Sequence, residues 1–311
     1  MLAIDVGGTK LAAGLVGPDG TVSSARRAPT PQGDGADAAA LWAAVLGLVR
    51  ELLDAAGRPR LAGVGVGCGG PMTWPDGEVS PVNIPGWRGF PLRARLAAEL
   101  GGPVRLHNDA ICLAVAEHWR GAAVGHPHAL GMVVSTGVGG GLVLGDRVVD
   151  GATGNAGHVG HVVVDPDGPL CPCGNRGCLE IVASGPAIAR DAVERGWRPP
   201  PDVPASAREL AAAARAGEPL AAAAFDRAGR MLGLGVATAV TLTDVSVVAI
   251  GGGVAQAGDL LFAPLQAGYA ERARLPYAQA ARVVPAALGA SAGLIGAAAL
   301  VQAGSRYWNA D

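Results

Sequence analysis

The sequence predicts an α/β protein built from two copies of one unit, with a cleft where the two copies face each other. The evidence is a sequence pattern that occurs at the beginning of each copy. An apolar segment, a Gly-containing turn and a second apolar segment occur over residues 2–16 and again over residues 129–144. Strand-like and helical patterns alternate after each of these blocks, as in α/β domains. At 311 residues the chain is long enough for two lobes of ordinary size.

The first copy begins with a predicted hairpin. Leu2–Val6 is a short apolar run, and Lys10–Val16 follows it directly after the Gly7-Gly8 turn. Apolar residues spaced three and four apart then predict a helix over 36–56. The other elements expected in this copy are strands at 61–66 and 104–107 and a helix at 110–120.

The second copy is followed by a segment that raises the question of a membrane span. Residues 286–304 carry no charge, but they are mostly Ala and Gly, whose transfer to lipid gains little. We therefore expect a helix packed inside a soluble protein. The other elements expected in this copy are strands at 129–135, 141–144, 159–164 and 245–250, helices at 206–243 and 255–274, and an extended segment at 282–285.

We expect two domains, a small lobe of residues 1–120 with 286–311 and a large lobe of residues 121–285. The net charge is −2 and the Lys and Arg residues are scattered, so no basic footprint for nucleic acid is expected. The apolar start runs into Asp5 without the basic region of a signal peptide. We expect a cytoplasmic protein without membrane partners.

The densest cluster of chemically active residues is a predicted zinc site. His161 is followed by Cys171, Cys173 and Cys178, so three of the five cysteines lie within eight residues. One His and three Cys make a closed tetrahedral set of the kind that holds structural Zn²⁺. The alternatives are a chance cluster or a disulfide with one leftover thiol, and a cytosolic setting with an odd cysteine count argues against the disulfide. Cys68 and Cys112 are expected to be small buried apolar residues.

Three glycine clusters are expected to bind a polyanion and a flat base. Glycine lets backbone N–H groups approach a phosphate without a Cβ in the way. Asp5 could hold hydrated Mg²⁺, while the third cluster could lie against a base; an ordinary hairpin turn is the alternative for the first cluster. The predicted cofactor-binding residues are Asp5, Gly7, Gly8, Thr9 and Lys10 in the first turn, Thr136, Gly137 and Gly139 in the second, and Gly251, Gly252 and Gly253 in the third.

A dinucleotide-binding motif is rejected. Gly65, Gly67 and Gly70 have the GxGxxG spacing, but Pro71 and Trp74 follow where that motif requires a helix. The Walker A pattern is absent from the sequence as well.

Two phosphate turns on a duplicated unit, a third glycine cluster and the His–Cys loop together resemble the ROK family of sugar kinases. That family has the actin-like ATPase (ribonuclease H-like) fold, and the resemblance covers essentially the whole chain. It implies ATP and Mg²⁺ beside Zn²⁺, a small sugar substrate, and a homodimer or a dimer of dimers. Repressors of the family carry a DNA-binding helix-turn-helix before the kinase core; because Asp5 lies so near the start, none is expected here.

The resemblance also implies roles for individual residues. Asp109 would be the catalytic base that takes a proton from the sugar hydroxyl as it attacks the γ-phosphorus; a helix N-cap is the alternative. His107 would either orient Asn108 or simply pack in its strand, and His118, His126 and His128 are expected on the surface. The residues expected to bind the sugar are Gly70, Asn83, Asn108, Asp109, His158, His161 and Glu180.

One residue departs from the glucokinase pattern of this family. Those kinases have Glu-x-Gly-His where this chain has His158-Val159-Gly160-His161. An imidazole offers one donor and one acceptor, which suits an N-acetyl carbonyl better than a diol. This variant resembles the bacterial N-acetylmannosamine kinases, although neutral drift within a glucokinase is the alternative. We expect an ATP-dependent 6-kinase for an N-acetylhexosamine, first N-acetylmannosamine and then N-acetylglucosamine, with glucose as the runner-up and a non-catalytic sugar sensor as the rival.

Overall fold

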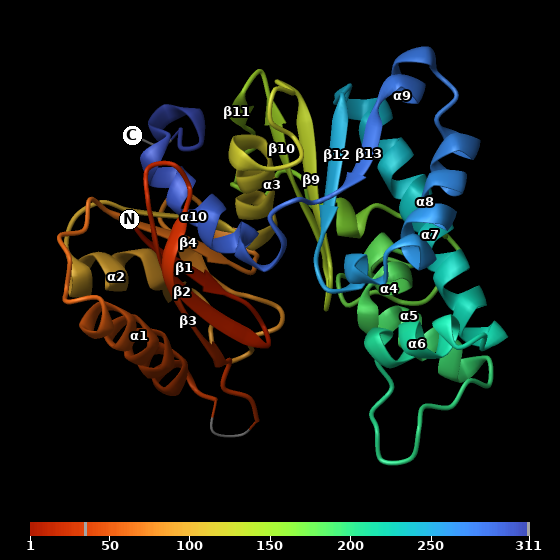
Figure 1. Cartoon of the computed structure of the whole chain (residues 1–311), viewed down its shortest axis with the longest axis horizontal. Coiled ribbons are helices and arrows are strands. Elements are labelled where there is room, and N and C mark those ends of the chain that lie inside the picture. Colours follow the sequence, from red (N-terminus) through yellow and green to blue (C-terminus); the bar gives the residue numbers. More distant parts are fainter. Residues whose placement is uncertain (34–35, 310–311) are drawn as a thin grey trace. The chain divides into compact units, whose positions relative to one another are not determined.

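The computed structural model describes residues 1–33 and 36–309, and it divides the chain into two compact units. Unit 1 comprises Met1–Pro127, Gly141–Gly157 and Ala287–Asp311. Unit 2 comprises His128–Gly140 and His158–Ala286. Figure 1 shows the elements of both units along the chain.

This division differs from the predicted lobes in three places: residues 121–127 lie in unit 1 instead of the large lobe, Ala286 lies in unit 2 instead of the small lobe, and residues 141–157 also change lobe. Residues 141–157, which the sequence analysis placed in the large lobe, lie in unit 1. They do so because Val148 is buried in an apolar cluster of that unit and because Gly141 lies against the Ile111 backbone, where a Cβ would come within 2.6 Å of the Ile111 Cα. Residues 310 and 311 of the predicted small lobe lie outside the described residues.

Unit 1 is built on a five-stranded sheet of order β3-β2-β1-β4-β8, in which β1 is antiparallel to β2 and parallel to β4. A small three-stranded sheet of order β5-β6-β7 is formed by the residues between β4 and β8 in the sequence. The strands are β1 Leu2–Val6, β2 Lys10–Val16, β3 Val22–Pro29, β4 Val64–Cys68, β5 Met72–Thr73, β6 Glu78–Val79, β7 Phe90–Pro91 and β8 Val104–Asn108. The helices are α1 Ala38–Ala55, α2 Leu92–Leu100, α3 Asp109–Arg120 and α10 Ala292–Gln302, with 3₁₀ turns at Gly289–Ser291 and Gly304–Arg306.

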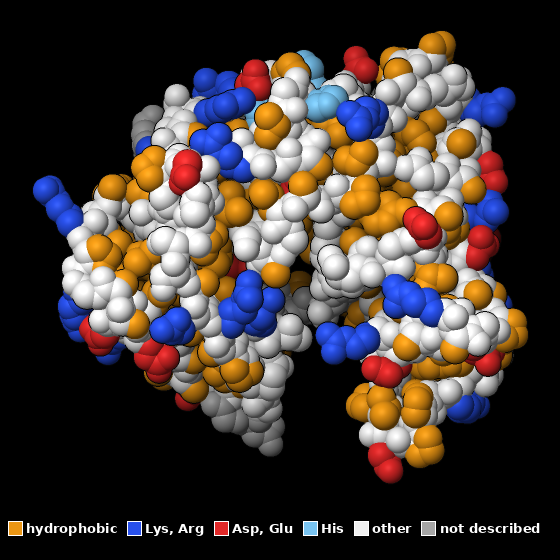
Figure 2. Space-filling view, viewed as in Figure 1, with side chains coloured by type: hydrophobic (Ala, Val, Ile, Leu, Met, Phe, Trp, Pro, Cys, Tyr) orange, Lys and Arg blue, Asp and Glu red, His pale blue; other side chains and the backbone are white. Residues whose placement is uncertain are grey.

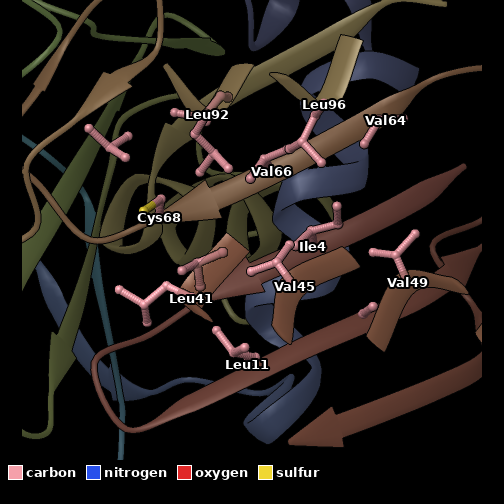
Figure 3. Close-up of a cluster of buried hydrophobic side chains, with 14 of the residues drawn as sticks. Ile4, Leu11, Leu41, Val45, Val49, Val64, Val66, Cys68, Leu92 and Leu96 are labelled. Atoms are coloured by element: carbon pink, nitrogen blue, oxygen red, sulfur yellow. The ribbon is translucent and has the colours of Figure 1, made fainter. Parts of the chain in front are cut away.

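Alternation along the strands of unit 1 separates two apolar layers. Leu2, Ile4 and Val6 of β1 lie in one buried cluster, whereas Ala3 lies in another. Figure 3 shows the first cluster, in which side chains of β1 and β4 meet those of α1 and α2. Cys68 is part of it, and Cys112 belongs to the second cluster, so both cysteines are the buried apolar residues that were predicted.

The uncharged segment near the C-terminus packs so closely on its neighbours that backbone meets backbone. A Cβ on Gly65 would come within 1.8 Å of the Ala297 carbonyl oxygen, and one on Gly296 within 1.7 Å of the Cys112 carbonyl oxygen. Helix α10 therefore contacts β4 and α3 through glycines, as expected for a helix buried in protein. The regular helix is shorter than predicted, since it begins at Ala292 after a 3₁₀ turn.

The second sheet repeats the order of the first. Its order is β11-β10-β9-β12-β13, with β12 parallel to both β9 and β13. The predicted duplication of an α/β unit is thus confirmed. The strands are β9 Ala129–Val134, β10 Val138–Leu144, β11 Arg147–Val148, β12 Val247–Gly251 and β13 Arg282–Pro285. The helices of unit 2 are α4 Leu179–Ala183, α5 Gly185–Glu194, α6 Ala207–Arg215, α7 Pro219–Thr243, α8 Asp259–Arg272 and α9 Pro276–Ala280, with 3₁₀ turns at Val159–His161 and Val254–Ala257.

Two local predictions were wrong. Residues 159–164 form a 3₁₀ turn and a loop instead of a strand, because Gly160 lies so close to β10 that a Cβ would come within 1.9 Å of the Val138 carbonyl oxygen. His118 is buried, with 3% of its surface exposed, since the segment after α10 covers it and Tyr307 Oη lies 2.6 Å from its Nδ1.

The surface is of mixed charge. On the face drawn in Figure 2, Lys and Arg side chains alternate with Asp and Glu side chains. Among the described residues, no helix combines the length and apolar character that crossing a membrane requires.

Candidate active site and metal centre

The first glycine turn of unit 1 is fixed by side chains that follow β3. The Gly7 N–H donates to the Lys10 carbonyl oxygen at 3.0 Å and closes the turn. Thr30 Oγ1 donates to the Gly7 carbonyl at 2.6 Å, and Gln32 Nε2 donates to the Gly8 carbonyl at 2.7 Å. These two side chains hold the turn in one conformation. Sequence reasoning missed both, because neither belongs to a recognisable motif.

Asp5 is partly buried in unit 1, near a second carboxylate. Burial raises the pKa of the Asp5 carboxyl to about 7, and the Asp109 carboxylate adds to this rise, while Lys10 and Arg27 oppose it. A Cβ on Gly293 would come within 2.5 Å of Asp5 Oδ2, so only glycine leaves room there for the carboxylate. A carboxylate whose charge Lys10 and Arg27 offset only in part is suited to a bound cation.

Asn108 and Asp109 stand at the junction of β8 and α3. Asn108 is the N-cap of α3, and its side chain accepts a hydrogen bond from the Ala110 N–H at 2.9 Å. Asp109 is the first residue of the helix, and its Oδ1 also accepts from Ala110 N, at 2.8 Å. The capping position is therefore held by Asn108, one residue before the predicted base. The rigid strand-to-helix junction fixes the direction of both side chains.

Asn83 lies beside the first turn, and Gly70 is hydrogen-bonded to the residue before it. The Val82 N–H donates to the Gly70 carbonyl at 3.1 Å. A Cβ on Gly8 would come within 2.6 Å of the Asn83 Cβ. Unit 1 thus brings Asn83 against the predicted phosphate turn, with Gly70 held to the neighbouring Val82.

The second glycine turn lies in unit 2, and Glu180 of α4 packs against it. The turn is closed by the Ser135 N–H, which donates to the Gly137 carbonyl at 2.8 Å. Glu180 Oε2 accepts from the Val138 N–H at 2.9 Å, and it would lie 2.5 Å from a Cβ on Gly137. Glu180 therefore lies against the turn, held by a backbone amide. Gly139 is outside the turn, in strand β10, because the strand resumes at Val138.

The third glycine cluster adjoins the second turn. Gly252 has a φ of +99°, and a Cβ there would come within 2.4 Å of the Val134 carbonyl oxygen. A Cβ on Gly253 would lie 3.4 Å from Ser135 Oγ. Bare backbone at the end of β12 is thus packed beside the end of β9, where the second turn begins.

The predicted metal ligands converge. The ligand atoms of His161, Cys171, Cys173 and Cys178 all lie within 4.8 Å of one another. His161 Nδ1 is 3.8 Å from Cys171 Sγ, and the Cys173 and Cys178 sulfurs are 3.6 Å apart. Around a Zn²⁺ ion with bonds of about 2.0–2.3 Å, tetrahedral ligands lie about 3.4–3.8 Å apart, so this set fits zinc.

The metal loop is shaped by its own backbone. The Cys171 N–H donates to the Asn175 carbonyl at 2.7 Å, and the Gly174 N–H donates back to Cys171 at 2.9 Å. Gly177 has a φ of +60°, and a Cβ there would come within 1.5 Å of the Asp165 carbonyl oxygen. These glycines let the chain reverse between the cysteines. The loop then runs directly into α4, which carries Glu180.

His158 lies beside His161, one of the predicted metal ligands. The two imidazole rings are stacked, with centroids 6.3 Å apart and an angle of 13° between the planes. The His161 N–H donates to the His158 carbonyl at 3.1 Å across the 3₁₀ turn. The turn that replaced the predicted strand therefore sets one histidine against the other.

A family model matches residues 1–304 and is described as the ROK family. The chain belongs to the ROK family. Among curated relatives, this ROK protein is 33% identical to a glucokinase of Thermotoga maritima over 97% of each chain. It is 37% identical to an N-acetylmannosamine kinase of Citrobacter koseri, over 97% of this chain and 98% of the relative. It is accordingly a sugar kinase of this family.

Solved ROK structures agree with its fold. A glucokinase of Streptomyces griseus in complex with glucose and AMPPNP superposes with a TM-score of 0.85 at 32% identity, covering 98% of this chain and 99% of that one. A ROK hexokinase of Thermus thermophilus superposes with a TM-score of 0.81 at 39% identity, covering 96% of each chain. The predicted actin-like ATPase fold is confirmed.

Proposed function

We propose that this ROK protein transfers the γ-phosphoryl group of ATP to the 6-hydroxyl of an N-acetylhexosamine, with N-acetylmannosamine as the preferred substrate. The observation that carries the choice of sugar is His158, an imidazole stacked on His161 where glucokinases of the family have a carboxylate.

Asp109 is the proposed catalytic base. Its carboxylate accepts the proton of the 6-hydroxyl while that oxygen forms a bond to the γ-phosphorus and the bond to ADP breaks. Asn108 binds the sugar and keeps the helix start in place, since its side chain caps α3. Gly70 and Asn83 complete the sugar-binding residues of unit 1.

The remaining groups bind phosphate and metal. Asp5 would hold hydrated Mg²⁺, which supplies positive charge to the phosphates when bound. The turns at Gly7–Lys10 and at Thr136–Gly137 offer backbone N–H groups to the phosphates, and Gly251–Gly253 offers bare backbone to the adenine. Zn²⁺ would be held by His161 and the three loop cysteines, and its contribution is to fix the loop that leads to Glu180.

His158 favours an acetamido group over a diol. A carboxylate accepts two hydrogen bonds from neighbouring hydroxyls, whereas an imidazole N–H donates one hydrogen bond and can meet a carbonyl oxygen. One satisfied hydrogen bond against one unpaired polar group is worth about 1–3 kcal/mol, which is about 10- to 100-fold in selectivity. The alternative substrates are N-acetylglucosamine and glucose.

The test is ADP release with glucose, mannose and their N-acetylamino forms. We expect kcat/KM for N-acetylmannosamine to exceed that for glucose by about 10- to 100-fold. His158→Glu should shift the ratio toward glucose, and His128→Glu, on an exposed residue of the same unit, should leave it unchanged. A native preference for glucose of tenfold or more would replace this proposal with a glucokinase. Absence of ADP release with every sugar would favour a sensor.

A further inference from the structure

Strand β8 is an edge strand, and its last peptide N–H is bound by a side chain. Within the described residues of unit 1, β8 stands at the end of the sheet order and pairs with β4 alone. The Asn108 N–H donates to His107 Nδ1 at 2.9 Å, in a buried position. The imidazole of the preceding residue therefore satisfies the amide immediately before the strand-to-helix junction.

This hydrogen bond fixes the tautomer of His107. Because Nδ1 accepts from a peptide N–H, the ring proton is on Nε2. Nε2 in turn faces Asp150 Oδ1 at 2.9 Å, so it donates to a carboxylate. His107 is fully buried and Asp150 is only 8% exposed, so water does not compete for these bonds.

The other oxygen of Asp150 is held by the segment after α10. Asn309 Nδ2 donates to Asp150 Oδ2 at 2.6 Å and lies 3.2 Å from the Val148 carbonyl. Both carboxylate oxygens are thus acceptors in a defined arrangement. A chain of hydrogen bonds runs from Asn309 through Asp150 and His107 to the peptide of Asn108.

Aromatic rings keep the imidazole in place. Trp74 is stacked on His107 with ring centroids 6.2 Å apart and an angle of 29°. Trp308 lies against Trp74 at 5.8 Å and is itself 1% exposed. A Cβ on Gly154 would come within 2.1 Å of the Trp74 Cβ, so the tryptophan cannot move away on that side.

We propose that His107 and Asp150 are positioning residues that hold the Asn108–Asp109 junction in its working geometry, with Asn309 anchoring the carboxylate. The proposal rests on the proposed function, because it assumes that Asp109 is the base. Its consequence is specific. The chain of hydrogen bonds from Asn309 to His107 contacts the peptide of Asn108 and does not contact the phosphate turns. Losing it should therefore lower kcat and raise the sugar KM while the ATP KM stays constant.

The decisive variant is Asp150→Asn. An amide can accept from only one of the two donors that the carboxylate serves, so its NH₂ group faces either His107 or Asn309. With the NH₂ toward His107, Nε2 must accept and Nδ1 must carry the proton, which then opposes the Asn108 N–H. We expect kcat to fall by about 10- to 100-fold, the scale for a small displacement of a reacting group. His107→Leu should act alike, and His107→Gln, which keeps a donor and an acceptor, should recover part of the activity.

The matched control is Asp146→Asn. Asp146 pairs with Arg306, from the same segment after α10, at 2.9 Å, and its Oδ1 also lies 3.3 Å from Nε2 of the buried His118, but it does not touch His107. Breaking this exposed pair tests whether merely loosening that segment lowers kcat. We expect Asp146→Asn to keep kcat within about twofold of the native value, consistent with the small worth of surface ion pairs.

The second measurement does not depend on turnover. Nitrogen-15 NMR of the imidazoles should show His107 as the Nε2–H tautomer in the native protein and as the Nδ1–H tautomer in Asp150→Asn. A native Nδ1–H tautomer, native kcat in Asp150→Asn with the changed tautomer, or native kcat in His107→Leu would overturn the proposal. An inactive native protein with the expected tautomers would instead contradict the proposed function, and the positioning role would fall with it.

Discussion

Replacing Asp5 by Asn should make the protein more stable while it abolishes turnover. Burial and the neighbouring Asp109 raise the pKa of the Asp5 carboxyl from 3.8 to about 7. The folded protein therefore holds the Asp5 proton more tightly than the unfolded chain does. Below pH 3.8 the carboxyl is protonated in both the folded and the unfolded chain, and it costs no stability. As the pH rises from 3.8 towards 7, the free energy of unfolding falls progressively.

The size of the effect follows from that pKa difference. Going from 3.8 to about 7 corresponds to about 4 kcal/mol, at about 1.4 kcal/mol for each pKa unit. This is an upper limit, because Asp5 is not wholly buried and water screens part of the penalty. Asn has nearly the same shape without the charge. We expect Asp5→Asn to raise the free energy of unfolding by about 2–4 kcal/mol at pH 8 and by less than about 1 kcal/mol at pH 4.

Urea unfolding of the native protein and the variant at pH 4, 6 and 8 measures this difference directly. Asp76→Asn is the control, because Asp76 is exposed and its replacement removes the same charge. Saturating Mg²⁺ and nucleotide should stabilise the native protein more than Asp5→Asn, since a bound cation relieves the penalty only where the carboxylate is present. If Asp5→Asn gains no more stability than Asp76→Asn at pH 8, the buried-charge reasoning is wrong.

Three further predictions address the other parts of the site. Asp109→Asn should keep sugar binding, measured by calorimetry, while kcat falls by at least about 100-fold; near-native turnover would exclude it as the base. Metal analysis of protein purified without chelator should find one Zn²⁺ per chain, and Cys173→Ser should lower both the zinc content and the melting temperature; protein free of zinc would contradict the site. Gly160→Ala should lower the melting temperature more than Gly47→Ala, because the Cβ at 160 meets backbone whereas the one at 47 meets nothing within 4 Å, and equal melting temperatures would refute the close approach.

The sequence predicted those elements of the fold whose signal lies within a few neighbouring residues. The apolar spacing of α1 follows from its burial on one face, with Leu41, Val45 and Leu52 inside. The glycine turns were visible because each ends an apolar strand. Strand β3 was missed because it alternates polar and small residues at the edge of its sheet, and β5, β6 and β7 because two-residue strands leave no periodic signal.

The site was predictable to the extent that its residues lie in motifs. The three cysteines and His161 converge as expected because the loop between them is short and rich in glycine. Thr30, Gln32 and Asp150 could not be found in this way. Each acts through a long-range contact, and Asp150 lies 43 residues from the His107 that it binds. His118 was misplaced for the same reason, since its cover comes from Tyr307.

The discontinuity of unit 1 has a consequence for biosynthesis. Leu294 and Leu300 of α10 share an apolar cluster with Ala3, Ala12 and residues of α3, so that layer closes only when α10 arrives. Ribosomes add about 5–20 residues per second, so after α3 is made the nascent chain waits about 8 to 33 s for residue 287. Most of unit 2 is one continuous stretch, His158–Ala286, which is complete before that moment. The part synthesised first is therefore the part completed last, and in the interval its uncovered apolar layer is a natural target for chaperones.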